Sequence, residues 1–304
     1  MSLTIASVNV NGIRAATKIR NEDNLGMLAW LNETSADVVL MQEVRATGDQ
    51  ARTALAPALE AGWHLAVAPA ETPGAKGRAG VGILSRTPLH NVEMGIPEFE
   101  DAGRFIAASL DDDTRVASLY LPSGSADTPK QDEKYRFLDQ FEPRLAQWAD
   151  QYPDMVIGGD WNICHRREDL KNWKTNTKKS GFLPHERAFM DAVFGTFPDE
   201  QPQDAEAKAD PVWAGAVEYA ADRRREASSS PRWFDVARRL QPEDAPYTWW
   251  TFRGQAFNNN AGWRIDVQAA TEAMLARAER TWVDKAPTVE QRWSDHSPLL
   301  VEYK

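Results

Sequence analysis

Three short segments, far apart in the chain, end apolar runs with side chains that could act on a phosphate. Residues 39–43 end in the carboxylate of Glu43, residues 155–160 end in that of Asp160, and residues 294–296 bring an acid and His296 together. Carboxylate oxygens are hard ligands for Mg²⁺ or Mn²⁺, and imidazole can carry a proton near neutral pH. These residue types indicate metal-assisted attack on a phosphate, provided that rigid elements hold them at one cleft.

Polar side chains also follow two other apolar runs. Asn9 and Asn11 end the first run of the chain, and Tyr120 ends the run at residues 115–121. Taken alone, asparagines at strand ends are commonly turn formers, and a tyrosine there is an ordinary half-buried aromatic. Because other polar side chains also end apolar runs, the amides of Asn9 and Asn11 can instead face a metal or a phosphate. The phenol can donate to a phosphate oxygen.

The segment Gly158-Gly159-Asp160-Trp161-Asn162 is more specific, because two glycines let the backbone approach closely. Asp160 can orient or deprotonate a water molecule, and Asn162 can hold that water or the phosphate. Read alone, the segment fits a simple Gly-Asp turn about equally well. Asp266 lies within a later apolar run, where a buried acid needs a partner, and His296 is the natural candidate.

Composition limits the class of protein. The 304 residues are 42% hydrophobic, which supplies a substantial core. No apolar run approaches the roughly 20 residues that a membrane helix needs, and the first residues read as a strand without a basic or apolar leader. Cys164, the single cysteine, excludes a disulfide within this sequence and a cysteine-based zinc site. We therefore expect a cytoplasmic protein.

The net charge of -10 opposes non-specific coating of nucleic acid, since a negative field repels phosphates. Residues 166–187 are basic, in contrast to the chain as a whole. Their only acidic residues are Glu168, Asp169 and Glu186. Their basic residues are Arg166, Arg167, Lys171, Lys174, Lys178, Lys179 and Arg187. Such a run is usually a solvated face. Its place just after a candidate catalytic strand favours contact with nucleic acid, since local fields act within about 8 Å.

Strand and helix patterns alternate along the whole chain. Strands are predicted at 3–10, 38–43, 64–68, 80–84, 105–110, 115–121, 155–159, 247–252, 263–269, 280–283 and 299–303. Helices are predicted at 24–32, 50–60, 130–151 and 184–194. Residues 111–114 read as a hairpin turn. Many strands with few helices predict an α+β fold of two packed sheets flanked by helices. Because no clean linker divides the chain, we predict one domain over 1–304.

One segment interrupts this pattern and predicts a surface insertion at 199–231. Residues 199–210 are polar and acidic, and Asp210-Pro211 is typical of a helix start. A helix would then run over 212–227 and end at the Ser-Ser-Ser-Pro of 228–231.

Taken together and in this order, the polar strand ends resemble a known family. The ordered set is Asn9, Asn11, Gln42-Glu43, Tyr120-Leu121-Pro122, Gly159-Asp160-Trp161-Asn162, Gly262-Trp263-Arg264-Ile265-Asp266 and Ser294-Asp295-His296, with Ser180-Gly181-Phe182-Leu183-Pro184-His185-Glu186-Arg187 between. It resembles the exonuclease III family of apurinic/apyrimidinic endonucleases, within the endonuclease/exonuclease/phosphatase superfamily. The likeness extends from residue 3 to residue 303.

The resemblance implies a DNase I-like four-layer sandwich, with two facing mixed β-sheets between outer helices and Mg²⁺ or Mn²⁺ at one rim. It implies Glu43 as metal ligand, with Asn9 and Asp295 nearby. It implies a catalytic set of Tyr120, Asp160, Asn162, Asp266 and His296, and leaves open whether Asp160 or His296 takes the proton of the water. The predicted DNA contacts are Asn11, Arg45, Lys174, Asn176, Lys178, Lys179, Trp249, Trp263 and Ile265. The three lysines follow from the basic run, and the resemblance implies that the last three residues line a pocket for an extrahelical abasic sugar.

The resemblance favours a monomeric DNA repair nuclease that cleaves the phosphodiester 5′ to an abasic site in duplex DNA. We also expect digestion from 3′ ends and removal of 3′-phosphates, and no membrane partner. Two alternatives stay open: another phosphoesterase of the same superfamily, or a catalytically inactive nucleic-acid-binding regulator on the same fold. Intact Glu43, Asp160, Asn162, Asp266 and His296 oppose the second alternative.

Overall fold

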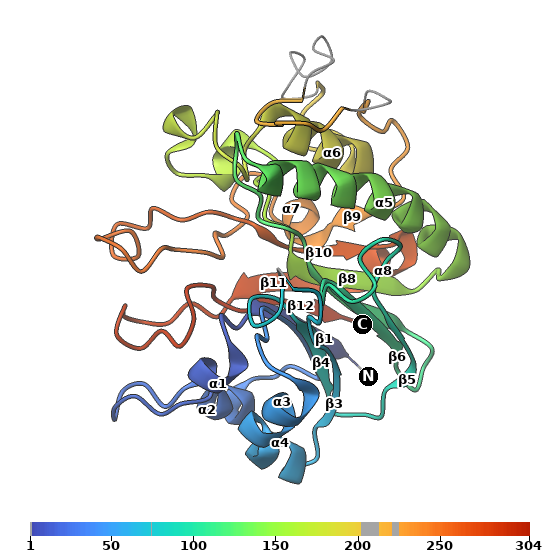
Figure 1. The fold of residues 1–304 in the computed structure, drawn as a ribbon. Coiled ribbons are helices and arrows are strands. Elements are labelled where there is room, and N and C mark those ends of the chain that lie inside the picture. The colour runs from blue at the N-terminus through green and yellow to red at the C-terminus, as the bar shows by residue number, and fades with distance from the viewer. Residues whose placement is uncertain (1, 74, 202–212, 221–224) are drawn as a thin grey trace.

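Two β-sheets face each other at the centre of the molecule, and helices cover their outer faces (Figure 1). The computed structural model describes residues 2–73, 75–201, 213–220 and 225–304. In the first sheet the strand order is β11-β12-β1-β2-β4-β3. Its strands are β1 (Leu3–Asn9), β2 (Val38–Gln42), β3 (His64–Ala68), β4 (Val81–Ser85), β11 (Ala278–Val283) and β12 (Leu299–Tyr303).

The second sheet has the order β5-β6-β7-β8-β10-β9. Its strands are β5 (His90–Met94), β6 (Phe105–Ser109), β7 (Arg115–Tyr120), β8 (Met155–Asp160), β9 (Phe234–Asp235) and β10 (Asp266–Ala270). Each sheet is mixed in the same way: β1 pairs parallel with β2, β7 pairs parallel with β8, and the other pairs are antiparallel.

Helical segments connect the parallel strands, as parallel pairing requires. Before the second sheet come α1 (Ile13–Ala16), α2 (Met27–Glu33), α3 (Gly48–Ala54) and α4 (Ala56–Glu60). The 23-residue α5 (Pro129–Gln151) links β7 to β8. Later come the 3₁₀ turns η1 (Arg167–Asp169) and η2 (Trp173–Thr175), and the helices α6 (Pro184–Phe194), α7 (Val236–Leu240) and α8 (Glu272–Arg277).

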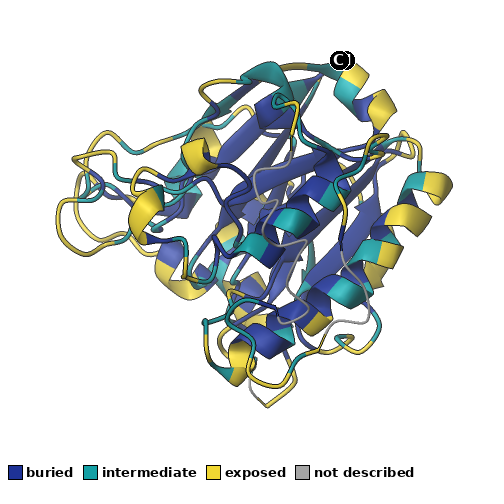
Figure 2. Ribbon diagram, turned by 90° about the horizontal axis from the view of Figure 1, so that it is seen from above, coloured by how far each residue is buried: buried dark blue, intermediate teal, exposed yellow. Residues whose placement is uncertain are grey.

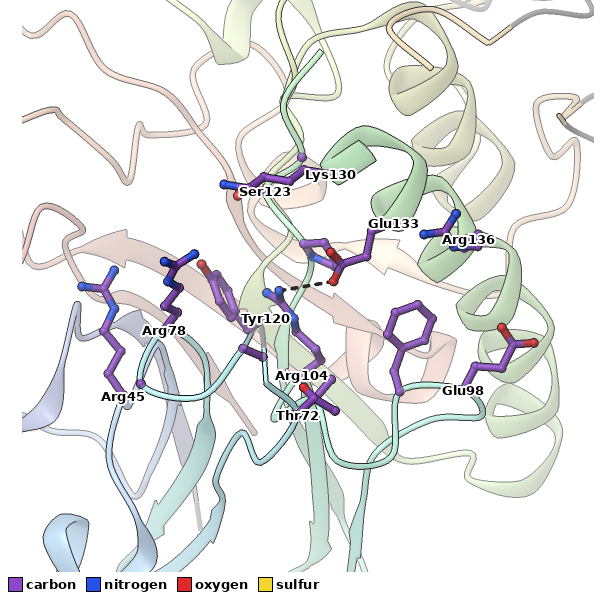
Figure 3. Close-up of a pocket in the computed structure, with 16 residues that line it drawn as sticks. Arg45, Thr72, Arg78, Glu98, Arg104, Tyr120, Ser123, Lys130, Glu133 and Arg136 are labelled. Atoms are coloured by element: carbon purple, nitrogen blue, oxygen red, sulfur yellow. Dashed lines mark ion pairs between the residues drawn. The ribbon is translucent and has the colours of Figure 1, made fainter. Parts of the chain in front are cut away.

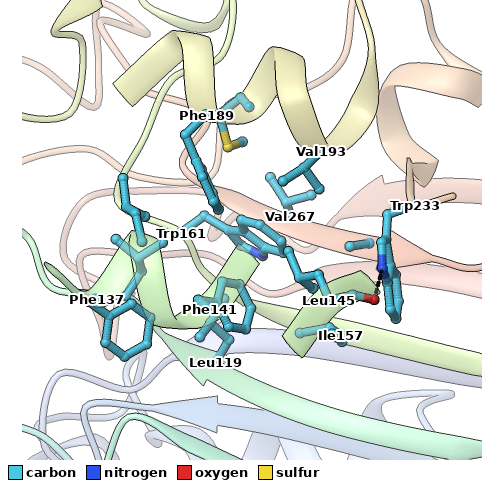
Figure 4. Close-up of a cluster of buried hydrophobic side chains, with 14 of the residues drawn as sticks. Leu119, Phe137, Phe141, Leu145, Ile157, Trp161, Phe189, Val193, Trp233 and Val267 are labelled. Carbon is cyan, nitrogen blue, oxygen red and sulfur yellow. Dashed lines mark hydrogen bonds between the residues drawn. The ribbon is translucent and has the colours of Figure 1, made fainter. Parts of the chain in front are cut away.

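Apolar side chains fill three layers between these elements, which gives the predicted four-layer sandwich. One cluster lies between the sheets and includes Ile5, Leu40, Ile106 and Val156. A second packs the first sheet against α1 to α4. The third packs the second sheet against α5 and α6, with Phe141 and Trp161 in edge contact at 5.7 Å (Figure 4). Buried residues follow both sheets, and the outer helices expose their far faces (Figure 2). The fold class predicted from the sequence is confirmed.

The helix at 184–194 has the predicted bounds, and the hairpin at 111–114 joins antiparallel β6 and β7. Asp112 accepts a hydrogen bond from the Thr114 N–H at 3.1 Å, as expected of an Asp turn. The helix predicted at 50–60 divides at Leu55 into α3 and α4, since Pro57 cannot continue the hydrogen-bond ladder. The helix predicted at 24–32 begins only at Met27, after Gly26.

The strand predicted at 247–252 is wrong. Trp249 makes only isolated bridges, to Trp263 on one side and to His296 on the other. The segment therefore crosses the rim of the sandwich, where Trp250 is buried by packing rather than by a sheet ladder and Phe252 is exposed. The strand predicted at 263–269 correspondingly begins at Asp266.

The helix predicted at 212–227 is wrong wherever the structure describes it. Residues 213–220 form turns, and Asp132 of α5 accepts hydrogen bonds from the N–H groups of Val217 and Glu218 at 2.8 and 2.9 Å. Trp213 stacks on His185 with ring centroids 5.0 Å apart. The rest of the predicted insertion, 202–212 and 221–224, lies outside the described residues.

In the part of the chain that the structure describes, none of the helices is long and apolar enough to cross a membrane.

Candidate active site

The four strands that pair in parallel end at one rim of the sandwich. β1 ends at Asn9 and pairs with β2, where Asn9 lies opposite Gln42. Glu43 is the next residue of the chain after Gln42. In the facing sheet Tyr120 of β7 is level with Asp160 of β8. Since β1 packs against β8 and β2 against β7, the four strand ends converge. The fold thus brings together polar side chains that are up to 151 positions apart in the sequence.

Asn9 joins the two sheets at this rim. Its Nδ2 donates to Glu43 Oε1 and to Asp160 Oδ2, both at 2.9 Å. The Tyr120 hydroxyl donates to the same Glu43 oxygen at 2.8 Å, and Arg45 pairs with the other oxygen. Asn9 is fully buried, and its Oδ1 accepts the N–H of Asn11 at 2.9 Å. Asn9 thus lies beside Glu43, the predicted metal ligand, and Tyr120, which is predicted to contact the phosphate, lies against the same carboxylate.

The backbone turns sharply as it leaves these strands. Asn11, Glu43, Arg45 and Asn162 all adopt left-handed conformations, with φ between 49° and 51°. This region is uncommon for residues other than glycine, and such residues gather at functional sites. The turn at Asn162 lets its own N–H donate to Asp160 Oδ1 at 3.0 Å, which fixes the carboxylate of Asp160.

His296 lies between two buried acids. Its Nδ1 is 2.8 Å from Asp266 Oδ2, and its Nε2 is 3.8 Å from Asp160 Oδ2. Asp266 is itself held by Thr248, whose hydroxyl accepts the Asp266 N–H at 3.1 Å. The sequence-based pairing of Asp266 with His296 therefore matches the geometry. Asp266 thus orients the imidazole through Nδ1, and Nε2 faces Asp160.

Burial and charge set the protonation states in this group. Burial raises the pKa of Asp160 to about 7, against the opposing effect of the His296 charge. Burial alone would lower the pKa of His296, but the carboxylates of Asp266 and Asp160 outweigh it and raise this pKa to about 10. Burial, followed by the charges of Glu43 and Asp160, holds the pKa of Tyr120 well above its ordinary value. Near neutral pH, Tyr120 and His296 are therefore proton donors, and Asp160 is poised to accept a proton.

Asp295 stands on the other side of Asn9. Its Oδ1 accepts from Asn11 Nδ2 at 2.8 Å, and its Oδ2 accepts from the indole of Trp249 at 3.0 Å. Trp249 also lies against the His296 ring, at 6.4 Å between centroids. Ser294, to which sequence reasoning gave no role, donates to the Asn9 carbonyl at 2.6 Å and so ties this turn to the end of β1.

The three residues predicted to form an apolar pocket lie together. Trp249 and Trp263 are paired through their backbones and meet edge to face, with centroids 5.8 Å apart. Both are half-buried and pack against a small cluster that contains the buried Ile265. This apolar wall begins next to His296.

A model of the Endonuclease/Exonuclease/phosphatase family matches residues 6–296 of this chain. The chain belongs to that family. An exodeoxyribonuclease of Bacillus subtilis is 27% identical over 98% of both chains. A DNA repair nuclease of Danio rerio is 28% identical over 99% of this chain and 82% of its own. The predicted relationship to exonuclease III and apurinic/apyrimidinic endonucleases, and the prediction of a hydrolase, are confirmed.

Solved structures share the fold of this family member. A 3′ phosphatase from Neisseria, bound to a product DNA hairpin, superposes with a TM-score of 0.76 at 23% identity and covers 99% of both chains. An AP endonuclease from Archaeoglobus fulgidus superposes with a TM-score of 0.74 at 22% identity, again over 99% of both chains.

A divalent cation at the rim would have to be held by the oxygen atoms of the side chains gathered there. Among the described residues, no three His, Cys, Asp or Glu side chains converge on a point that could hold a metal ion. Mg²⁺, however, usually keeps several waters and takes one or two protein carboxylates together with substrate oxygens. The carboxylate of Glu43, whose side chain is 13% exposed at the rim, lies beside the amide of Asn9 and meets this requirement. The residues present therefore fit a divalent cation such as Mg²⁺ or Mn²⁺, which Glu43 would hold.

A groove of about 850 Å³ opens next to Tyr120 (Figure 3). Its cations are Arg45, Arg78, Arg104, Lys130 and Arg136, and its acids are Glu98 and Glu133. The guanidinium of Arg104 lies 4.7 Å from the centre of the Tyr120 ring. Sequence reasoning missed Arg104, because only the pairing of β6 with β7 brings it to the rim. The excess of positive charge makes this groove suitable for phosphates despite the acidic chain.

The structure divides the basic run at 166–187 into two kinds of residue. Arg166 and Arg187 are buried; Arg166 pairs with Asp199, and Arg187 packs over the ring of Phe182. Lys174, Lys178 and Lys179 are exposed. Asn176, predicted to contact DNA, is buried and donates its amide to the Asn172 carbonyl at 2.8 Å. Its visible role is thus to shape the turn that carries the three lysines.

Proposed function

We propose that this protein is a DNA repair nuclease. It would hydrolyse the phosphodiester 5′ to an abasic site in duplex DNA, and would also digest 3′ ends and remove 3′-phosphates. The observation that carries the proposal is the buried group of Asp160, His296 and Asp266, joined through Asn9 to Glu43. The names of the Bacillus subtilis and Danio rerio relatives support DNA as the substrate. Cytoplasmic location and a monomeric state stay predictions.

Each side chain has one task in the proposed reaction. Asp160 accepts a proton from the attacking water, because its pKa lies near neutrality while that of His296 does not. His296 is held by Asp266, and it donates from Nε2 to a phosphate oxygen as negative charge grows there. Tyr120 and Asn162 hold further oxygens of the phosphate. When bound at Glu43, Mg²⁺ or Mn²⁺ would neutralise developing charge on the phosphate and its leaving oxygen.

One assay tests this function directly. A duplex with a single abasic analogue should be cut on its 5′ side by the protein in the presence of Mg²⁺ and left intact in its absence. Undamaged duplex and a 3′-phosphorylated duplex measure the other two activities. Cleavage of a phosphoinositide or nucleotide ester in preference to DNA would favour another phosphoesterase. DNA binding without cleavage of any substrate would favour an inactive regulator.

Replacing Lys174, Lys178 and Lys179 together by Ala should weaken DNA binding and leave turnover at saturation largely unchanged. Each phosphate contact that is lost should reduce the slope of log K against log salt by about 0.9. The slope can be measured by titrating labelled duplex at several salt concentrations.

The matched control removes three positive charges elsewhere. The control residues are Arg277, Arg280 and Lys304. Because β12 runs antiparallel to β1, its end at Tyr303 lies at the far end of the sheet from the rim at Asn9. If both triple variants keep the parent slope, the three lysines face solvent in the complex.

Trp263→Ala should reduce cleavage at an abasic site more than it reduces 3′-phosphate removal. A wall that receives an extrahelical sugar matters most when a nucleotide must leave the helix, and Trp263 forms such a wall with Trp249 and Ile265. The measurement is the ratio of the two activities at matched folded fraction. Trp282→Ala is the control, since Trp282 is also half-buried but packs in a different cluster.

Loss of packing alone would give a different result for Trp263. A buried Trp→Ala change costs about 3 to 5 kcal/mol of stability and would impair both activities alike. A proportional fall in both, with a large drop in melting temperature, would assign Trp263 to the core.

A further inference from the structure

A fully buried lysine lies beneath the rim, on helix α5. Lys134 has no exposed surface, although lysine is almost never buried without a partner. Its Nζ is 2.6 Å from Glu186 Oε1 of α6, and Glu186 is also fully buried. Neither residue touches Glu43, Asp160 or His296 through any contact that the described residues show. The pair therefore lies behind the catalytic group rather than within it.

The ammonium of Lys134 connects the loops that follow the two catalytic strands. It donates to the carbonyl of Asn162, after β8, at 2.9 Å and to that of Ser123, after β7, at 3.3 Å. A longer contact of 3.5 Å reaches the hydroxyl of Ser180, in the loop before α6. The side-chain amide of Asn162 adds a further link, because it donates to the Leu121 carbonyl at 2.9 Å. Three loops thus take their positions from one cation.

Glu186 fixes the cation from the other side. Its Oε2 accepts the N–H groups of Gly181 and Leu183 at 2.7 and 2.9 Å. Its Oε1 accepts from the Ser180 hydroxyl at 3.0 Å and from Gln131 Nε2 at 3.1 Å. A carboxylate with this many donors has little freedom to move.

The space around the pair is closed. A Cβ added at Gly124, which has a φ of +70°, would lie 2.5 Å from both Gln131 Oε1 and Ser180 Oγ and 2.9 Å from Lys134 Cδ. The junction can therefore not shift without moving the loop after β7. Charge-assisted hydrogen bonds in such dry surroundings hold their partners more firmly than neutral ones.

We infer that Lys134, held by Glu186, is a positioning residue for the reaction: it fixes the backbone of Asn162 and thereby the amide that meets the phosphate. The inference rests on the proposed role of Asn162. A buried ion pair is weak evidence for stability, since apolar residues of similar volume often do as well. The ion pair instead matters for the position of Asn162, because a misplacement of about 1 Å at a reacting centre can cost about 100-fold in rate.

A double-mutant cycle tests this inference. Lys134→Met removes the three donors and keeps an unbranched chain of similar length. We expect a 10- to 100-fold loss of kcat with a smaller change in KM, measured per folded protein on abasic duplex. In the Asn162→Ala background the same substitution should change kcat less than about twofold, because residues that act through one another are not additive.

The control is another buried cation, an arginine that pairs with acids on the same helix. Arg225 is buried and pairs with Asp139 and Glu142 on α5, away from the loops that Lys134 contacts. Arg225→Met should lower the melting temperature, with kcat per folded protein within about twofold of the parent. Multiplicative effects of Lys134→Met and Asn162→Ala, or an equal loss of kcat in Arg225→Met, would overturn the inference and make Lys134 merely structural.

Two further arrangements keep the outcome decisive. If Lys134→Met does not fold, the same double-mutant cycle is run with Glu186→Gln. This change weakens the bond to Lys134 and keeps the size of the side chain at position 186. The parent enzyme separates this inference from the proposed function: if it cleaves no abasic duplex, the substrate assignment fails. The cycle is then run on whichever phosphoester the parent does cleave, and the same additivity criterion applies.

Discussion

Glu43→Ala should abolish most of the hydrolytic activity. Loss of an outer-shell partner of a metal ligand typically costs about 10- to 100-fold, and we expect loss of the principal anionic ligand to exceed 100-fold. Glu43 follows β2 at the rim and belongs to none of the three apolar clusters of the sandwich, so the protein should stay folded. The measurement is the initial rate on abasic duplex as a function of Mg²⁺ concentration, with circular dichroism and melting curves for each variant.

The shape of the Mg²⁺ dependence distinguishes a ligand from a bystander. A weakened ligand set should shift half-maximal activity to higher Mg²⁺ concentration, and excess metal should recover part of the rate. Glu33→Ala is the control, since Glu33 is an exposed acid at the end of α2 shortly before the same strand. If Glu43→Ala cleaves at the parent rate in limiting Mg²⁺, the principal ligand lies elsewhere.

Three of the candidate site residues, Glu43, Tyr120 and Asp160, could be predicted from the sequence because each ends or directly follows a strong strand pattern. Glu43 and Asp160 end fully buried strands, whose apolar runs leave little ambiguity about where the strand stops. Once two sheets were expected, polar residues at strand ends could be expected to share a rim. The hydrogen bonds of Asn9 to both acids then give that rim its geometry.

The features that the sequence did not predict depend on contacts between distant segments. β5 is exposed along its whole length, so it carries no alternating pattern, and β9 is two residues long. The aromatic run at 247–252 has the composition of a strand, but it makes only isolated bridges, and packing at the rim buries only part of it. Lys134 looks like an ordinary polar residue of an amphipathic helix until α6 supplies Glu186. Pairing across the fold, which no local pattern encodes, decides each of these cases.

His296→Asn and Asp266→Asn should each reduce kcat by about 10⁴-fold, the loss found when the acid that orients a catalytic histidine is made neutral in a serine protease. Asp266 fixes His296 at 2.8 Å and supplies most of the charge that keeps the imidazole protonated. The double variant should lose little more than the worse single variant, because the pair acts as a unit. Rates are measured as single turnovers with saturating enzyme, which separates the chemical step from DNA binding.

The pH profile gives an independent test with a definite sign. The carboxylates around His296 raise its pKa to about 10, so the parent should keep its proton donor up to that pH and lose activity above it. Asp266→Asn removes the nearest of these charges, and the alkaline limit of its residual activity should move to lower pH. The folded state should likewise lose the contribution of this ion pair as pH rises from about 6.5 toward 10, since the unfolded chain releases the proton first. If the two single losses multiply in the double variant and the alkaline limit stays in place, His296 and Asp266 work independently, and the charges of Asp160 and Asp295 must keep His296 protonated.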